Sequence, residues 1–280
     1  MSSIVIHGGI IKFEGAHTGA KEYRVELERI VKAASAVLNN SNAREAVLYA
    51  IRALENCPLF NAGTGSRIQA DGEIRMSAAL MDGNANRFSG IINVQYVKNP
   101  IDLAALLAEE QFKVLAGPEA TRYARAQGVL SHSPYTKHRL QEFQKKAFGR
   151  SGTVGAVAVD KDGAIYAATS TGGVGGETPG RVSDSATVAG NYATGRVGVS
   201  CTGVGEEIVN HATAARVAVR VEDGMALREA VAKTIGEARA RGYTFGLIAL
   251  DRDGEVVVDQ TAGRVLFGYF RDGDVVVFHP

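Results

Sequence analysis

This sequence has little cysteine and almost no excess of charge of either sign. Its 280 residues include two cysteines, Cys57 and Cys201, whose wide separation fits reduced thiols rather than a disulfide framework. The 31 lysine and arginine residues nearly balance the 30 acidic residues, which leaves a net charge of +1. This balance gives no reason to expect a nucleic acid or an anionic membrane as partner.

Long apolar runs are missing as well. No stretch approaches the roughly 20 apolar residues that span a bilayer. The N-terminal "MSSIVIHGG" has no basic segment, long apolar segment or cleavage site of a signal peptide. We therefore expect a soluble, cytoplasmic protein.

The common metal and nucleotide motifs are also absent. The six histidines show no HExxH spacing and no CxxC accompanies them, so we expect no zinc site. Among the 33 glycines there is no Walker A string, and "GVGEEI" lacks the third glycine of G-x-G-x-x-G. The "DKDG", "DRDG" and "RDGD" strings lack the loop of about twelve residues that an EF-hand needs, and they are turn sequences.

What is present is a core-forming sequence, 45% hydrophobic, with runs of helices and strands that are segregated along the chain. Apolar spacing predicts helices over 20–39, 42–55, 205–222 and 225–241, with further helical character in 100–148. Ser41 or Asn42 is placed to cap the helix over 42–55. Strands are expected at 4–7, in 67–97 and 197–203, and in three strand–turn–strand units that begin at Thr153, Thr244 and Val265. This order predicts an α+β fold with helices packed on sheets. The length of the chain allows one large domain or two small ones.

Unusual polar content lies beside these apolar strands in the second half of the chain. Each polar residue taken alone is typical of a cap, a turn or, for Thr153, the first position of a strand. Together they resemble a site, and they are Thr153, Thr169, Ser170, Thr171, Arg181, Asp184 and Thr202.

Several motifs, in order along nearly the whole chain, resemble those of the plant-type (type 2) L-asparaginase and isoaspartyl aminopeptidase family of N-terminal-nucleophile (Ntn) hydrolases. They are "HGG", "CPLFNAGTGS", "MDGN", "GTVGAVAVD", "ATSTGG", "PGRVSDS" and "SCTGVGE". The resemblance implies a single domain, residues 1–280, that is a four-layer αββα sandwich in which antiparallel sheets are flanked by helices. It also implies a precursor that cuts itself between Gly152 and Thr153, which would give an α subunit of residues 1–152 and a β subunit of residues 153–280.

Such a cut is chemically coherent. An internal threonine hydroxyl is a weak nucleophile without a base, whereas a threonine at a new N-terminus carries its own α-amine as the base. A preceding glycine tolerates the strained backbone that an N→O acyl shift requires.

The resemblance assigns roles to the other residues. Thr171 supplies a hydroxyl next to the nucleophile, and Thr202 with the backbone N–H of Gly203 forms an oxyanion hole. Arg181 and Asp184 bind the α-carboxylate and the α-ammonium of a β-aspartyl group, with Gly203 and Gly205 alongside. The structural alternative for Arg181 and Asp184 is an ordinary surface salt bridge.

In the first half of the chain, the resemblance places Asn61 beside the nucleophile. It also implies a structural sodium ion, bound by the backbone carbonyls of Leu54, Glu55, Cys57, Phe60, Ala62 and Thr64, while catalysis itself needs no cofactor. The segment before the cut, Gln141–Ser151, is shorter than in many relatives, and this leaves the rate and completeness of cleavage open.

The sequence thus predicts a threonine amidohydrolase that acts on isoaspartyl (β-aspartyl) dipeptides and L-asparagine through a β-aspartyl-enzyme intermediate. Two alternatives stay open: a glycosylasparaginase-like amidase, and an uncleaved, inactive scaffold of the same fold. The family implies small-molecule substrates and a homodimer of cut protomers, (αβ)2, with neither nucleic acid nor membrane as partner.

Overall fold

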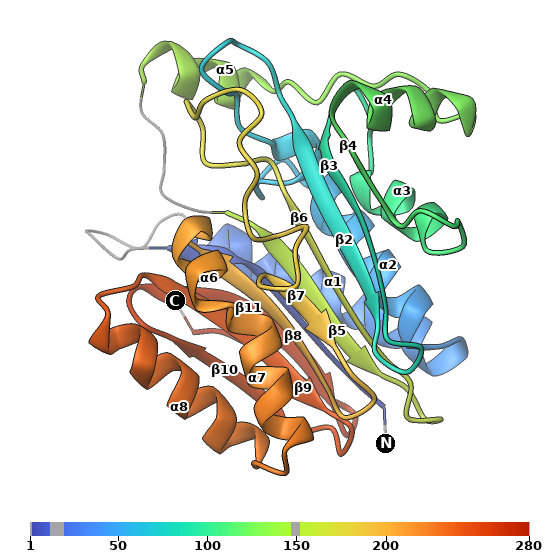
Figure 1. Cartoon of the computed structure of the whole chain (residues 1–280), viewed down its shortest axis with the longest axis vertical. Helices are drawn as coiled ribbons and strands as arrows, with labels where there is room; N and C mark the ends of the chain where they lie inside the picture. Colours follow the sequence, from blue (N-terminus) through green and yellow to red (C-terminus); the bar gives the residue numbers. More distant parts are fainter. Residues whose placement is uncertain (1, 12–19, 147–151, 280) are drawn as a thin grey trace.

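A computed structural model describes residues 2–11, 20–146 and 152–279, and two β-sheets form its centre (Figure 1). The larger sheet has eight strands in the order β12-β11-β1-β5-β6-β2-β3-β4, and the smaller has the order β10-β9-β8-β7. The large-sheet strands are β1 (Ser3–Ile11), β2 (Met76–Asp82), β3 (Arg87–Val94), β4 (Val114–Ala116), β5 (Val154–Val159), β6 (Ile165–Thr171), β11 (Arg264–Arg271) and β12 (Asp274–Val277). The small-sheet strands are β7 (Asn191–Ala193), β8 (Val197–Gly203), β9 (Phe245–Asp251) and β10 (Val256–Gln260).

Helices flank both sheets, and the sheets also contact each other. Helices α1 (Ala20–Asn40), α2 (Ala43–Asn56) and α3 (Pro100–Leu107) pack on the large sheet, and α7 (Thr213–Glu222) and α8 (Leu227–Ala240) pack on the small one. Strands β5 and β6 contact β8 across the space between the sheets. The fold is therefore mixed α and β with sheets flanked by helices, which is compatible with an Ntn-hydrolase fold. The remaining helices are α4 (Gly117–Ala126), α5 (Lys137–Gln144), α6 (Gly205–His211) and the short 3-10 helix η1 (Gly63–Gly65).

Strand β5 shows how the sequence builds this arrangement. Its alternate residues Ala156 and Ala158 belong to the core beneath α1 and α2, whereas Val157 and Val159 belong to the core between the two sheets. Because side chains alternate across a strand, Thr153 falls on the face that looks toward the small sheet. The same alternation puts Thr171 on that face of β6.

The two halves of the chain on either side of Gly152 are interleaved within the large sheet. Strand β1 lies between β5 and β11, and β2 pairs with β6. Fragments separated at Gly152 would therefore share one hydrogen-bonded sheet and one core. The stretch directly before it, residues 147–151, lies outside the described residues.

Most of the expected elements are confirmed. Both N-terminal helices are present, and the Asn42 side chain caps α2 by accepting a hydrogen bond from the Glu45 amide at 3.0 Å. The three expected hairpins are the antiparallel pairs β5–β6, β9–β10 and β11–β12.

Other expectations were wrong. Residues 68–75 form no strand, although the turn expected at "ADG" is present at residues 70–72. The helix expected over 205–222 is divided at Ala212, which adopts a left-handed conformation with φ 49° and ψ 43°. The strands β4 and β7 were missed because three residues are too short to show a period. In the part of the chain that the structure describes, no helix has both the length and the apolarity to cross a bilayer.

Candidate active site

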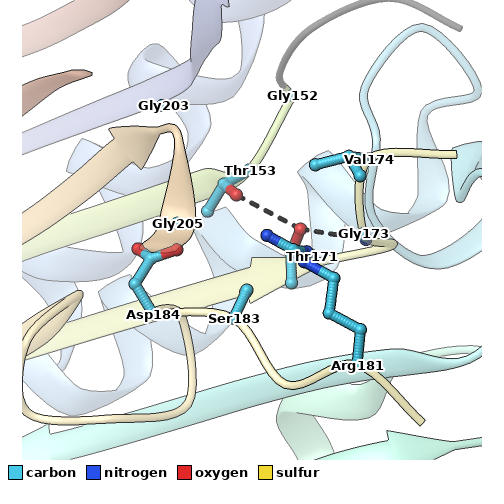
Figure 2. A pocket seen from close by; sticks show the side chains of 10 residues that line it. All are labelled: Gly152, Thr153, Thr171, Gly173, Val174, Arg181, Ser183, Asp184, Gly203 and Gly205. Atoms are coloured by element: carbon cyan, nitrogen blue, oxygen red, sulfur yellow. Dashed lines mark hydrogen bonds between the residues drawn. The ribbon is translucent and has the colours of Figure 1, made fainter. Parts of the chain in front are cut away.

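Thr153 lies at the start of the central strand β5 and is buried, with 7% of its surface exposed. Its Oγ1 donates a hydrogen bond to Thr171 Oγ1 at 3.2 Å (Figure 2). Thr171 ends the neighbouring strand β6, and its Oγ1 also accepts the amide of Gly173 at 3.2 Å. Ser185 Oγ lies 3.4 Å from Thr153 Oγ1. The hydroxyl of Thr153 is thus held among other hydroxyl groups, with no amine or imidazole among its hydrogen-bond partners in the described residues.

A small pocket opens beside this hydroxyl. It brings together residues from the ends of β5 and β6, from the loop that follows β6, and from the turn between β8 and α6. The lining residues are Gly152, Thr153, Thr171, Gly173, Val174, Arg181, Ser183, Asp184, Gly203 and Gly205 (Figure 2). The structure therefore assembles in one place seven of the residues that the sequence singled out. Gly173, Val174 and Ser183 were missed, although "ATSTGG" contains Gly173, "PGRVSDS" contains Ser183, and Val174 directly follows the first of these strings.

Gly203 is a position that only glycine can fill. Its φ is +147°, and a Cβ atom there would lie 2.5 Å from Phe245 Cα on the paired strand β9. The preceding Thr202 is fully buried and does not line the pocket, but its Oγ1 has no hydrogen-bond partner among the described residues. A buried hydroxyl without a partner is costly, and this one belongs to the residue before Gly203, which lines the pocket.

Arg181 pairs with a residue that the sequence reasoning missed. Its Nε and Nη2 donate to the two carboxylate oxygens of Glu206, at 2.6 and 2.9 Å. The Arg181 side chain is 14% exposed, and no Arg181–Asp184 ion pair occurs among the described residues. The alternative of an ordinary surface salt bridge between Arg181 and Asp184 was therefore wrong. The available signal was the "GEE" that follows the "SCTGV" motif.

Asp184 is buried, with 2% of its surface exposed, and its Oδ2 has no hydrogen-bond partner among the described residues. Burial raises the pKa of this carboxyl to about 7, although the positive charge of Arg181 acts in the opposite direction. An unpartnered oxygen on a buried carboxylate favours a cationic ligand, because a cation would restore the interactions lost with water.

Asn61 lies against the residue that precedes Thr153. Its Nδ2 donates to the carbonyl of Gly173 at 2.5 Å, and its own carbonyl accepts the amide of Gly172 at 2.9 Å. A Cβ atom at Gly152 would lie 2.5 Å from Asn61 Cβ. Asn61 thus ties the turn after Thr171 to the backbone just before Thr153.

The loop at 54–64 has a geometry that fits a cation. A side chain at Gly63 would meet the carbonyl oxygen of Glu55, and one at Gly65 would meet the carbonyl oxygens of Phe60 and Pro58. Convergent carbonyl oxygens are ligands for hard cations. The described residues contain no cluster of three His, Cys, Asp or Glu side chains for a metal.

The carboxyl group of Glu55 is directed elsewhere. It is fully buried and accepts hydrogen bonds from Ser170 Oγ at 2.7 Å, Asn99 Nδ2 at 3.0 Å and the Ile101 amide at 3.2 Å. Burial raises its pKa to about 8. This carboxyl therefore joins the end of α2 to β6 one residue before Thr171.

His7 lies beneath Thr153 and was not singled out beyond its place in "HGG". Its Nε2 is 3.0 Å from Ser200 Oγ, which is 2.7 Å from Thr169 Oγ1. Burial lowers the pKa of His7 to about 3, although its proximity to the backbone of Thr153 acts in the opposite direction. The imidazole is thus neutral at physiological pH and links β1, β8 and β6 under the pocket.

Comparison with known proteins gives one consistent result. The sequence model of a family described as asparaginase matches residues 1–151 and 145–278. A Synechocystis sp. protein named isoaspartyl peptidase/L-asparaginase is 42% identical over 95% of this chain and 87% of its own length. A Nostoc sp. protein of the same name is 40% identical over 98% of this chain and 92% of its own. A plant-type L-asparaginase from Thermococcus kodakarensis is 33% identical over 98% of this chain and 97% of its own.

Proposed function

Because the chain belongs to the asparaginase family, we propose that it is an amidohydrolase that cleaves β-aspartyl bonds in isoaspartyl dipeptides and in L-asparagine, with Thr153 as nucleophile. One observation carries the proposal. In a single pocket, the Thr153 hydroxyl lies with the guanidinium of Arg181 and a buried oxygen of Asp184 that has no partner among the described residues. This set matches an acyl group that carries a carboxylate and an ammonium.

The nucleophile first has to be released from the chain. In the proposed self-cleavage, Thr153 Oγ1 attacks the carbonyl carbon of Gly152, the C–N bond between the two residues breaks, and the hydroxyl proton ends on the Thr153 nitrogen. Water then hydrolyses the ester to give a carboxylate on Gly152 and a free hydroxyl and α-amine on Thr153. An α-amine has a reference pKa of about 7.7–8.0, so a useful fraction is neutral near pH 7.

Turnover then uses the same groups. The α-amine of Thr153 takes the proton of Oγ1 as the oxygen attacks the β-carbonyl carbon, and the protonated amine passes that proton to the leaving nitrogen. The proposed oxyanion donors are the unpartnered Thr202 hydroxyl and the backbone N–H of Gly203, which lines the pocket. Water hydrolyses the β-aspartyl ester, and aspartate leaves.

The shared sheet supports a product that stays folded after the cut. Strands from both fragments alternate in the large sheet, with β1 between β5 and β11. We accordingly propose one αββα domain made of both fragments. A homodimer of cut protomers, which the family resemblance implies, and a cytoplasmic location are further proposals.

A denaturing gel and a substrate panel test this function. We expect fragments that separate at Gly152–Thr153 in the wild-type protein and an uncut Thr153→Ala variant. The cut protein should release aspartate from β-aspartyl dipeptides and asparagine faster than from aspartylglucosamine. A preference for aspartylglucosamine would indicate a glycosylasparaginase-like amidase, and a full-length band without activity on any substrate would indicate the inactive scaffold.

A structural sodium ion in the 54–64 loop is a separate proposal. The carbonyls of Glu55, Phe60 and their neighbours would hold the ion, and the ion would stiffen the loop that carries Asn61. A ligand that binds only the folded state raises the free energy of unfolding by RT ln(1 + [L]/Kd), so stability increases with the ligand concentration. We therefore expect a higher melting temperature in sodium chloride than in choline chloride at equal ionic strength, and equal melting temperatures would refute the site.

A further inference from the structure

A second cavity lies on the other side of Gly152, with a volume of about 100 Å³. Its walls are formed by β1, the start of α1, the loop after α2, and α5. Gly152 lines both this cavity and the Thr153 pocket, and no other described residue lines both. Gly152, whose peptide bond to Thr153 is proposed to break, therefore lies between the two cavities.

Among its described lining residues, the second cavity has two buried arginines and one carboxylate. Arg67 and Arg139 line it and are 8% and 5% exposed. Arg139 Nη1 donates to Glu142 at 2.6 Å and its Nε donates to the Gly65 carbonyl at 2.7 Å. Glu142 is the one carboxylate among the described lining residues. It pairs with Arg139, its negative charge also acts to raise the pKa of Arg67, and His138 Nε2 lies 3.4 Å from its other oxygen.

The two guanidinium groups also influence each other. The pKa of Arg67 is lowered by burial and then by the positive charge of Arg139. A carboxylate between them would offset this repulsion and offer a planar partner for two guanidinium forks. The opposite wall is mostly apolar, with Tyr23, Leu59 and Phe60.

The position of the cavity indicates which carboxylate it would bind. With the β-carbonyl of a substrate at Thr153, the aspartyl half occupies the pocket of Arg181 and Asp184. The leaving residue then has to extend away from that pocket. The cut turns Gly152 into a chain end, so the backbone no longer fixes the partition on this side.

We propose that this second cavity binds the leaving residue of a β-aspartyl dipeptide, with Arg67 and Arg139 binding its α-carboxylate and the apolar wall contacting its side chain. The inference rests on the proposed function and specifies its substrates. They are dipeptides with a free C-terminal carboxylate and an apolar leaving residue. Amides of such dipeptides lack the charge that the cavity selects.

The test compares β-aspartyl-leucine with β-aspartyl-leucinamide on the cut wild-type enzyme. We expect kcat/KM to be at least about tenfold higher for the free acid, because a lost hydrogen-bonded charge costs that much or more. L-Leucine should also inhibit more strongly than L-leucinamide. Equal kcat/KM and equal inhibition would overturn the proposal, because the cavity would then serve the chain's own terminus alone.

Variants show whether the two arginines are responsible. Arg67→Gln and Arg139→Gln should each bring the acid-to-amide ratio toward one, with rates normalised to the cut fraction. The matched control Arg122→Gln, at an exposed position of α4, should keep the wild-type ratio. An unchanged ratio in Arg67→Gln would overturn the proposal. Failure on every substrate, asparagine included, would instead contradict the proposed function.

Discussion

Gly152 and Asn61 are in such close contact that a Cβ atom at residue 152 would lie 2.5 Å from Asn61 Cβ. On its other side, a Cβ atom at Gly9 would lie 3.0 Å from Gly152 Cα. The residue before the proposed nucleophile is thus in close contact with strand β1 and with the loop that carries Asn61, which are far apart in sequence. Asn61 cannot easily yield, because its side chain is also bonded to Gly173 and to the Arg67 amide.

This confinement predicts that Gly152→Ala slows self-cleavage by at least about tenfold. The added methyl group has to displace Asn61 or the scissile carbonyl, and a small displacement from the attack geometry is costly. Band intensities on a denaturing gel over time measure the rate. Gly195→Ala is the control, since a Cβ there meets nothing within 4 Å. A wild-type rate in Gly152→Ala would contradict this reading of the contact.

Arg181 donates two hydrogen bonds to the carboxylate of Glu206, and we therefore expect Arg181→Lys to weaken substrate binding. Lysine keeps the charge but lacks the fork that Glu206 already binds through Nε and Nη2. We expect KM for asparagine to rise about tenfold or more and kcat to fall less, because the contact is made in both the ground state and the transition state.

Steady-state kinetics on the cut protein measure both constants. The matched control is Arg228→Lys, whose wild-type guanidinium pairs with Glu255 at an exposed site and should not matter. A fall in kcat alone would place Arg181 closer to the chemistry than proposed.

The raised pKa of Asp184 leads us to expect that substrate recognition depends on pH. Its carboxyl has a pKa raised to about 7, and only the ionised form can pair with a substrate ammonium. The kcat/KM for asparagine should therefore fall as the pH drops through about 7. The Thr153 α-amine also loses activity on protonation, so a second substrate is needed to separate the two groups.

Succinamic acid, which lacks the α-amino group, serves this purpose. Its kcat/KM should follow the amine alone, and the pH profiles of the two substrates should differ near pH 7. Asp184→Asn should lower kcat/KM for asparagine by at least about tenfold and for succinamic acid by much less. Identical profiles in the wild-type protein would remove Asp184 from ammonium recognition.

The raised pKa of Glu55 leads us to expect that the free energy of unfolding depends on pH. Burial raises its folded-state pKa to about 8 from the ordinary 4.5 of a glutamate, so the folded protein holds the proton more tightly than the unfolded chain. The corresponding stability is fully present below about pH 4.5 and is lost as the pH rises through about 8, by an amount on the order of a few kcal/mol. Asp184 adds a change of the same sign between about pH 4 and 7.

Urea unfolding at several pH values measures this effect. Glu55→Gln, which stays neutral and keeps an oxygen for Ser170, should flatten the decline in unfolding free energy between pH 5 and 8 relative to wild type. Glu229→Gln on the exposed face of α8 is the control and should leave the decline unchanged. A steep decline retained in Glu55→Gln would show that other groups cause it.

Much of the fold could be predicted because its signals are local. Helical spacing marked α1 and α2, Asn42 marked the cap between them, and the "DKDG" and "DRDG" turns marked hairpins whose strands alternate apolar side chains. The failures are also local in origin. A left-handed Ala212 has no sequence signature, and a three-residue strand such as β4 shows no period.

For the candidate site, the sequence by itself determined which chemical groups are available: a threonine after a glycine at the head of a strand, with an arginine, an aspartate and glycine turns in a fixed order. Only the tertiary structure decided what those groups touch. Arg181 pairs with Glu206, and burial raises the pKa values of Asp184 and Glu55. Burial also keeps His7 neutral near Thr153. Gly152 lines both cavities. The physical reason is that burial and charge pairing depend on residues brought together from distant parts of the chain, and no local pattern records them.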